Sequence, residues 1–592
     1  MINDDHQLDD FFGYKPDHVD KLEKHRNGKW FKSIKEKIRL LPKLLSFKER
    51  YIVFTLLLII VGSIISIPFT TYSHFTKGSP SYGGSFVEGV IGEPRHINPL
   101  LAQASDTDRD LVGLVYSSLL KYNEEGKLVP DLAKSYEISS DGLNYTVYLK
   151  DNAKWHDGTP VTVDDVIFTI DTALNSDYGS LQQANWTSIE TEKVNDVTII
   201  FKLKNKYAQF LNNLTLSILP RHVWQDIKPI NFALSDFNLK PIGSGPFMFD
   251  KLTRDRDGKI ISYKLKRNES YYDPGAMIDS IQFNFYDSED QLIDAYNRNE
   301  IENLGYISPS NLDRVKFKSR LNIQEIKMPR YFSAFFNSNQ NEFLSDKNIR
   351  LALAHGTDRQ ALINKILGGH GTIVDSPLIG NILDVGNDVK KYDYDFKLAQ
   401  QILDESGWKT INADGIRTKK DKSLKIKITT STWPELADAA ELIKDQWRTL
   451  GVDASIEVLP TPALQSVIRD RSYDILLFGE ILSIDPDPFT FWHSSGKKDR
   501  GQNFALYDNK LADSLLEEAR QTLNPIERMK KYDDFQKIVT EDIPAIFLYN
   551  SYYIYGQTDA IKEFDTKIIA TPSDRFSGIE KWYINTKRIW KN

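Results

Sequence analysis

The stretch LADAAELIKDQWRTLGVDASIEV, residues 436–458, decides the fold class of this chain. Its first part has apolar residues at helical spacing that end at a glycine, namely Leu436, Ala440, Ile443, Trp447, Leu450 and Gly451. Its second part alternates apolar and polar residues as a half-buried strand does, with Val452, Ala454, Ile456 and Val458 on the apolar side. A helix followed at once by a strand is typical of an α/β protein.

The same mixture of signals continues through the chain from Phe86 onward. A capping box at Thr162–Asp165 and the sequence Asn524-Pro-Ile-Glu527 each predict the start of a helix. An α/β part of over 500 residues is expected to form at least two lobes. Strands are predicted from the alternating apolar positions Leu143, Tyr145, Val147 and Leu149; Val197, Ile199, Phe201 and Leu203; Ile261, Tyr263 and Leu265; and Ile281, Phe283 and Phe285.

Composition excludes several classes of protein. The chain has no Cys, so it has no disulfide and no Cys that would accept a lipid. Its formal net charge is −7, and the acidic excess lies after residue 50. Because a nucleic-acid-binding domain needs a basic face, we expect no nucleic-acid partner.

The run Tyr51–Phe75 contains no Lys, Arg, Asp or Glu. About 20 apolar residues in a helix span the hydrocarbon core of a bilayer, so a membrane anchor is predicted over 51–72. Residues 21–50 carry eleven Lys and Arg against three acids, which predicts a cytoplasmic segment 1–50 and an exported C-terminal part. A cleaved signal peptide is the alternative, although no small-x-small site follows the run. The Gly-, Ser- and Pro-rich segment 73–85 is expected to be a flexible tether.

Enzyme motifs are missing from the sequence. It holds no Gly-x-x-x-x-Gly-Lys-Ser/Thr, no Gly-x-Gly-x-x-Gly and no His-Glu-x-x-His, and without Cys it has no thiol nucleophile. A Ser/His/Asp triad assembled from distant positions stays open, and with it a cell-surface hydrolase. We expect no enzyme activity, no catalytic residues, no metal ligands and no cofactor.

Two short clusters attract attention. Trp155-His-Asp-Gly158 lies between a strand and a capped helix, and we interpret it as a turn in which Asp157 accepts hydrogen bonds from backbone amides. The segment Ser483–Ser495, SIDPDPFTFWHSS, directly follows the apolar strand Tyr473–Phe478. Loops at the ends of strands in α/β proteins are where ligands usually bind, so this loop is predicted to bind one.

These segments, in this order, resemble family 5 of the extracellular solute-binding proteins of ABC transporters, the oligopeptide, dipeptide and nickel receptor group. The resemblance runs from about Gly84 to the C-terminus. It is carried by Glu93–Pro99, Val115–Asn123, Val129–Tyr136, Asp141–Leu149, Lys154–Val166, Phe210–Leu214, Leu219–His222, Pro241–Phe249, Leu265–Tyr272, Asn348–Arg359, Ala399–Trp408 and the Asp485-Pro-Asp-Pro loop.

The resemblance implies an α/β, two-lobed periplasmic-binding-protein-like fold with an extra subdomain in the first lobe, here preceded by one transmembrane helix. The first lobe is expected over 86–330, with the subdomain at about 120–235. The second lobe is expected over 331–550, and residues 551–592 return to the first. Members of the family close over a ligand by hinge motion and deliver it to a permease.

The resemblance also implies ligand contacts from both lobes. The candidates are Glu93, Arg95, His96 and Tyr116 in the first lobe and Gly479, Glu480, Ile481, Ser483, Asp485 and Trp492 in the second. Peptide-binding members typically have Gly-Trp-x-x-Asp in the second segment, where the Asp pairs with the free amine of the peptide. This chain has Gly479-Glu-Ile-Leu-Ser483 instead. Because a buried ammonium needs a paired carboxylate, either Glu480 or Asp485 supplies it, or the ligand is not a free-amine peptide.

The sequence therefore predicts a monomeric, membrane-anchored receptor that binds peptides or another small solute outside the cell. Its expected partners are an ABC permease with its ATPase subunits and, through the N-terminal helix, the membrane. Two alternatives stay open: a peptide sensor without import, and a receptor for a non-peptide solute such as an oligosaccharide or a metal chelate.

Overall fold

The computed structural model describes residues 46–592, apart from positions 381, 384, 387, 499, 500, 591 and 592 and the side chains of residues 65, 68, 69 and 73. The chain divides into two compact units, Met1–Ser79 with Lys587–Asn592 and Pro80–Thr586. Most of the predicted basic N-terminal segment lies outside the described residues.

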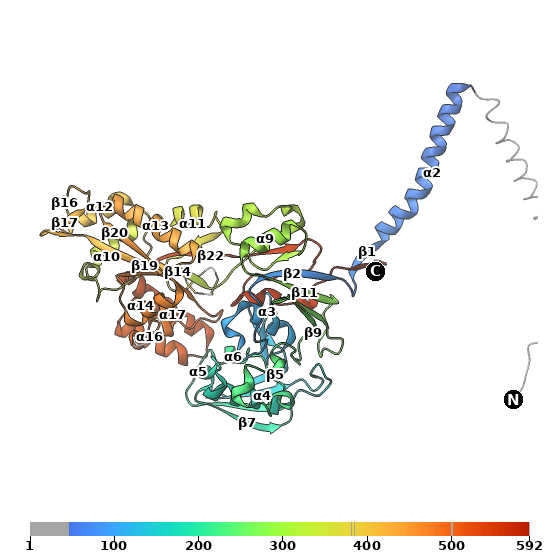
Figure 1. Ribbon diagram of the computed structural model, residues 1–592, viewed down its shortest axis with the longest axis horizontal. Coiled ribbons are helices and arrows are strands. Elements are labelled where there is room, and N and C mark those ends of the chain that lie inside the picture. Colours follow the sequence, from blue (N-terminus) through green and yellow to red (C-terminus); the bar gives the residue numbers. More distant parts are fainter. Residues whose placement is uncertain (1–45, 381, 384, 387, 499–500, 591–592) are drawn as a thin grey trace, which may run out of the picture. The chain divides into compact units, whose positions relative to one another are not determined.

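The described residues of the first unit form a long helix followed by a strand that pairs with another near the C-terminus (Figure 1). α2 (Phe47–Phe75) begins at a capping box, in which the Ser46 backbone N–H donates to Glu49 Oε2 at 2.8 Å. β1 (Thr76–Pro80) follows the helix and pairs with β24 (Thr586–Trp590). The predicted flexible tether over 73–85 is therefore partly helix and partly strand. The strand that pairs with β1 lies near the other end of the sequence, so no local sequence signal could predict this pairing.

α2 covers the uncharged run that was predicted to cross a membrane. Apolar side chains along it are exposed, such as Phe54 at 62% and Leu58 at 57%. In the part of the chain that the structure describes, however, no helix is long and apolar enough to cross a membrane. The predicted helix is confirmed, whereas the membrane span is not found.

In the second unit, a seven-stranded sheet forms the first lobe and gathers strands from distant parts of the sequence (Figure 1). Its order is β13-β23-β12-β2-β11-β10-β9, and β2 pairs in parallel with β11 and β12. The strands are β2 (Ser85–Ile91), β9 (Phe247–Arg254), β10 (Ile260–Arg267), β11 (Ser280–Tyr286), β12 (Asn303–Leu304), β13 (Leu321–Ile326) and β23 (Tyr553–Thr558). The helices and 3-10 turns are η2 (Ala102–Ala104), α3 (Asp106–Val115), α9 (Glu289–Asn297), η5 (Pro309–Arg314), η6 (Lys318–Arg320), η9 (Pro572–Phe576) and η10 (Ile579–Lys581).

The first lobe carries a subdomain built on the four-stranded sheet β5-β6-β8-β7. The predicted alternation is confirmed in β6, where every second side chain is buried, and the capping box of Thr162 and Asp165 starts α4. The predicted turn is confirmed as well, because Asp157 accepts a hydrogen bond from the Thr159 N–H at 3.0 Å. The elements are β3 (Leu120–Tyr122), β4 (Leu128–Pro130), β5 (Ala133–Ile138), β6 (Asn144–Leu149), α4 (Val163–Leu174), η3 (Ser176–Tyr178), α5 (Gln183–Trp186), β7 (Ile189–Asn195), β8 (Thr198–Leu203), α6 (Phe210–Asn213), α7 (Arg221–Trp224), α8 (Pro229–Phe232) and η4 (Asp236–Asn238).

The burial pattern predicted for β10 is wrong at one residue, Ile261. Ile261 was assigned to the same face as Tyr263 and Leu265, which are buried. The Ile261 side chain is instead 41% exposed, because the register of β10 against β9 shifts between Ile260 and Ser262. Such a bulge turns a side chain to the opposite face of the sheet.

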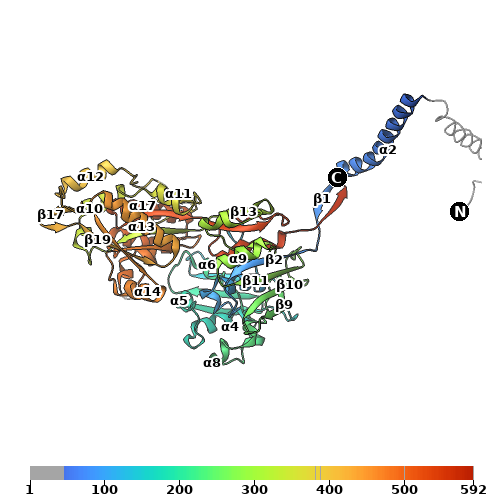
Figure 2. The same cartoon turned by 45° about the horizontal axis from the view of Figure 1, so that its top comes forward.

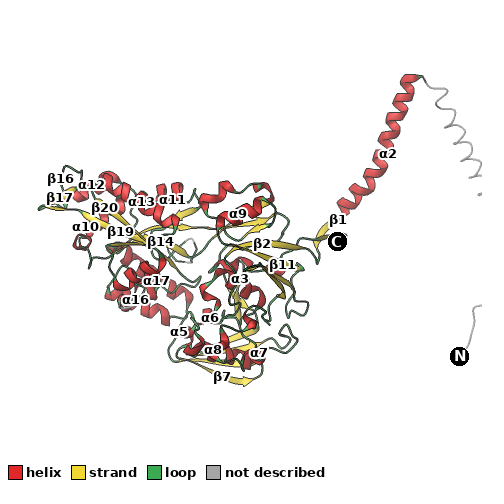
Figure 3. Ribbon diagram, in the orientation of Figure 1, coloured by secondary structure: helices red, strands yellow, loops and turns green. Residues whose placement is uncertain are grey.

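The second lobe is a six-stranded sheet of order β15-β22-β14-β21-β19-β20 with a hydrophobic core on each face. Figures 1 and 3 show α11, α12 and α13 on one side of its strands and α14, α16 and α17 on the other. In the turned view of Figure 2, α12 and α14 again lie on opposite sides of the sheet. The residues that decide the fold class form α13 and β20, with β20 parallel to β19. The elements are β14 (Arg330–Phe336), η7 (Glu342–Ser345), α10 (Lys347–His355), α11 (Arg359–Ile366), β15 (Gly371–Ile373), α12 (Phe396–Glu405), β16 (Thr410–Ile411), β17 (Arg417–Lys419), β18 (Lys422–Ser423), β19 (Lys425–Ser431), α13 (Pro434–Thr449), β20 (Asp453–Leu459), α14 (Thr461–Asp470), β21 (Ile475–Ile481), α15 (Phe489–Trp492), η8 (Ser494–Lys497), α16 (Lys510–Gln521), α17 (Pro525–Asp542) and β22 (Ala545–Ser551).

Two short connections join the lobes. One is residues 327–329, between β13 and β14, and the other is Tyr552, between β22 and β23. The Asn550 Nδ2 donates to the Met328 carbonyl oxygen at 2.8 Å, which holds the two connections side by side.

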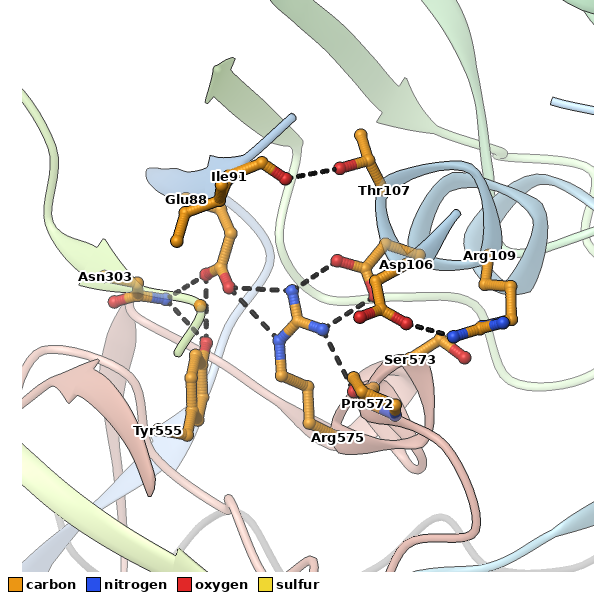
Figure 4. A network of polar contacts seen from close by, with 12 residues as sticks. Glu88, Ile91, Asp106, Thr107, Arg109, Asn303, Tyr555, Pro572, Ser573 and Arg575 are labelled. Atoms are coloured by element: carbon orange, nitrogen blue, oxygen red, sulfur yellow. Dashed lines mark hydrogen bonds and ion pairs between the residues drawn. The ribbon is translucent and has the colours of Figure 1, made fainter. Parts of the chain in front are cut away.

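A buried guanidinium fastens the first lobe together. Figure 4 shows Arg575 of η9 between Glu88 of β2 and α3. Its Nη1 and Nη2 donate to the two carboxylate oxygens of Asp110 at 2.7 and 2.6 Å, and its Nη2 donates to Glu88 Oε1 at 3.1 Å. Glu88 Oε2 also accepts from Asn303 at 2.9 Å and from the Tyr555 hydroxyl at 3.0 Å. Burial raises the pKa of Glu88 and Asp110 although Arg575 opposes the shift.

Replacing Arg575 with Met should therefore destabilise the fold strongly. Two carboxylates would lose their buried counter-ion, which typically costs about 3–5 kcal/mol in the free energy of unfolding. Chemical denaturation of R575M measures this loss. R298M is the control, because Arg298 forms an exposed ion pair with Glu300, worth about 0–1 kcal/mol. Equal stability of both variants would contradict a fastening role for Arg575.

Candidate functional site

The first lobe contains a cavity of about 410 Å³. This volume is in the range of small-ligand sites. Its walls come from η2 and α3 with the loop that follows, from the subdomain around α5 and α6, and from η9 and η10. The polar lining residues include Gln103, Arg109, Tyr116, Ser117, Lys121, Asp131, Asn185, Asn212, Asp574 and Glu580.

Arg575 holds two walls of the cavity, α3 and η9, in position. Asp110, which it binds, lies on α3 between the lining residues Arg109 and Val112. Asp574 and Phe576, its own neighbours in η9, also line the cavity. The position of the site therefore depends on the buried network.

One lysine and two carboxylates supply most of the charge in the cavity wall. Lys121 Nζ lies 2.6 Å from Glu580 Oε1 and 3.7 Å from Asp131 Oδ1. Desolvation opposes the charge of Lys121, but the two acids outweigh it and raise the pKa of the ammonium well above its ordinary value. The Tyr272 hydroxyl donates to Asp131 at 2.6 Å. These groups are already paired, so a ligand meets a stiff polar wall there.

Two residues of the cavity wall carry buried hydroxyls that are left without partners. Tyr116 is 3% exposed, and neither its hydroxyl nor Ser117 Oγ forms a hydrogen bond within the described residues. A buried polar group without a partner typically costs about 1–3 kcal/mol. A ligand that bonds with these hydroxyls would recover that free energy, which makes Tyr116 the strongest of the predicted site residues.

The loop after β21 is held from two helices. Asp485 accepts from Arg528 of α17 at 3.0 Å, and Asp487 lies 2.7 Å from the Arg520 guanidinium of α16. Ser483 Oγ donates to the Asp485 carbonyl oxygen. The loop also touches the subdomain, because Gln209 Nε2 donates to the Pro486 carbonyl oxygen at 3.2 Å. Asp485 is therefore engaged by an arginine, although its charge still contributes to raising the pKa of the cavity residue Tyr122.

Glu480 is buried in the second lobe and does not line the cavity. Its Oε2 accepts from the Tyr331 hydroxyl, and Trp492 Nε1 donates to the same hydroxyl at 3.1 Å. Burial raises the pKa of Glu480 to about 8, against the hydrogen bond from Tyr331 and the influence of the nearby Trp492 indole. The neighbouring candidates differ: Gly479 packs against Phe332, and Ile481 is 55% exposed.

The other first-lobe candidates lie outside the cavity. Glu93 Oε2 accepts from the Ile260 N–H at 3.1 Å, so this carboxylate supports β10. Arg95 is exposed, and its backbone N–H donates to Asp108 Oδ1 at 2.8 Å. His96 is half-buried beside Asp108, where its charge opposes a rise in the pKa of that carboxyl. The structure thus brings only Tyr116, of the ten candidates, into the cavity wall.

Sequence reasoning missed Ser117, Lys121, Asp131 and Glu580. The first three lie inside the matching segments Val115–Asn123 and Val129–Tyr136, which is the one signal that could have drawn attention to them. Glu580 reaches Lys121 across more than 450 positions, and no local pattern predicts that contact. Across the described ranges, no group of three or more His, Cys, Asp or Glu side chains is arranged to hold a metal ion.

The family model of the bacterial extracellular solute-binding proteins, family 5 (middle), matches residues 127–503. The chain belongs to this family. The oligopeptide-binding protein AppA of Bacillus subtilis is 29% identical over 520 residues, which cover 86% of this chain and 93% of AppA. Its structure in complex with a nonapeptide has a TM-score of 0.68 and covers 86% of this chain and 100% of that one.

Two further solved structures match the same family fold at 28% identity. NikZ of Campylobacter jejuni, in complex with Ni(L-His), has a TM-score of 0.69 and covers 84% of this chain and 99% of that one. The substrate-binding protein CtaP of Listeria monocytogenes has a TM-score of 0.74 and covers 85% of this chain and 100% of that one. The family and the two-lobed α/β fold expected from the sequence are thereby confirmed.

The pH dependence of stability should report the state of Glu480. Its folded pKa of about 8 lies above its ordinary value of 4.5, so the folded protein holds a proton that the unfolded chain releases. This contribution is complete below about pH 4.5 and is lost as pH rises through about 8. The free energy of unfolding of the wild type, compared with E480Q at each pH, should therefore fall over that window. A difference that stays constant from pH 5 to pH 9 would show that Glu480 does not titrate there.

Proposed function

We propose that this chain is the solute receptor of an ABC importer and that it binds peptides between its two lobes, with the cavity of the first lobe as part of the site. The observation that carries the proposal is the buried, unpartnered hydroxyl of Tyr116, a residue that lines the cavity. Peptides offer a donor and an acceptor at every residue, so they can satisfy such groups regardless of their sequence. The similarity to AppA, whose structure holds a nonapeptide, supports this choice. The permease and its ATPase subunits are the partners that we propose to receive the ligand.

Peptides of 2–10 residues should raise the melting temperature of the purified full-length receptor, because a ligand that binds only the native state stabilises it. Y116F should bind the same peptides about two- to tenfold more weakly, which corresponds to about 0.5–1.5 kcal/mol for one hydrogen bond. Its melting temperature without peptide should not fall, since the lost hydroxyl has no partner in the protein. Calorimetric titration measures both affinities, and Y394F at an exposed position is the control.

If no peptide stabilises the receptor but a nickel–histidine complex or an oligosaccharide does, the non-peptide alternative replaces the peptide proposal. The similarity to NikZ makes the nickel complex the first such probe. Peptide binding that is equally tight in Y116F would place the peptide elsewhere in the protein.

We further propose that residues 51–72 hold the receptor at the cell membrane as a single-pass anchor, with segment 1–50 in the cytoplasm and the second unit outside. The support is the uncharged run in the sequence and the exposed apolar side chains of α2. The full chain should stay with membranes after carbonate extraction, whereas a chain that begins at Pro80 should be released. Release of both would remove the anchor proposal and leave the receptor proposal untouched.

A further inference from the structure

A second group of unpartnered polar atoms lies between the lobes, among residues that do not line the cavity. Glu435 is in the first turn of α13 and is 6% exposed. Within the described residues, neither of its carboxylate oxygens accepts a hydrogen bond. The Tyr306 hydroxyl of the first lobe lies near the carboxylate and opposes the rise of its pKa, so Glu435 faces both lobes.

Aromatic rings lie around Arg330, the nearest cation, and the Tyr306 and Tyr549 hydroxyls lie near the Glu435 carboxylate. The ring of Phe332 lies 5.5 Å from that of Trp433 and 5.2 Å from that of Tyr549. The Arg330 guanidinium lies 5.2 Å from the Phe332 ring and donates to Ser551 Oγ at 2.7 Å. The Tyr549 hydroxyl is buried and has no partner in the described part of the chain.

Arg330 does not neutralise Glu435. Its charge tends to lower the pKa of Glu435, yet the two side chains form no ion pair, and desolvation prevails and raises that pKa. The dipole of α13 stabilises an anion at its start only weakly. Glu289, the other acid nearby, is already engaged, because its Oε1 accepts from the Ser308 N–H at 2.6 Å. A buried carboxylate with two free acceptor oxygens therefore lacks a donor.

We propose that Glu435 forms a subsite for a cationic group of the ligand, an ammonium or guanidinium that donates to the free carboxylate oxygens between the aromatic rings. The geometry favours a cation over an anion, because both carboxylate oxygens of Glu435 are buried and lack a donor. Aromatic faces add to the attraction for a cation. The inference rests on the proposed function. It specifies the class of peptide bound: peptides that place a Lys or Arg side chain, or a free amine, next to Glu435.

Calorimetric titration of the full-length receptor with matched peptides tests the subsite. The probes are alanine heptapeptides with one lysine at each position in turn, each paired with the same peptide carrying norleucine. Wild type should bind at least one lysine peptide tenfold or more tightly than its norleucine partner. The isosteric change Glu435→Gln should abolish this preference while the norleucine peptides bind as before. The control Glu441→Gln, on the exposed face of the same helix, should keep the preference.

Each other outcome contradicts the subsite. Equal binding of lysine and norleucine peptides by wild type overturns it without any variant, so the test does not depend on whether E435Q folds. If E435Q still binds the lysine peptide more tightly than the norleucine peptide, a group other than Glu435 recognises the charge. If none of the peptides binds, the proposed function fails and the inference fails with it, whereas peptide binding without a charge preference overturns the inference alone.

Discussion

The ion pair of Arg575 with Glu88 and Asp110 is the interaction on which the rest of the first lobe depends. It joins a central strand near the start of the lobe, the helix that follows it and a turn close to the C-terminus. All three groups are buried, so each is tolerable only while the others stay in place. Because α3 and η9 both line the cavity, the shape of the site is set by a contact among residues that do not line it.

Two buried glutamates of the second lobe, Glu480 and Glu435, differ in their surroundings and therefore in their roles. Glu480 is enclosed by Tyr331 and Trp492, and burial raises its pKa so far that it is mostly protonated at neutral pH. It therefore acts as part of the core, at the position where the family resemblance leads one to expect tryptophan. Glu435 faces a polar junction between the lobes and has both oxygens free. The substitution at position 480 is thus compatible with a receptor whose charged ligand group is recognised elsewhere.

Local signals were enough to predict much of the fold. The helix and strand of residues 436–458, the alternation in β6 and the capping box before α4 all depend on neighbours within a few positions, where periodicity and capping chemistry act. The site was less predictable because its walls come from segments far apart. Tyr116 was identified through its place in a matching segment, but nothing local shows that Glu580 meets Lys121 or that Glu93 supports the Ile260 amide. The bulge at Ile261 and the pairing of β1 with β24 were missed for the same reason.

The loop that follows β21 has a consequence for how such receptors diversify. Arg528 and Arg520 hold its two aspartates from separate helices, and Ser483 fastens its backbone from within. The path of the loop is therefore fixed by side chains other than that of Ile484, which lies close to Gly126 of the first lobe. Residues at this position can change by mutation while the backbone keeps its course. Evolution, or a designer of biosensors, could alter what the loop contacts without rebuilding the scaffold that presents it.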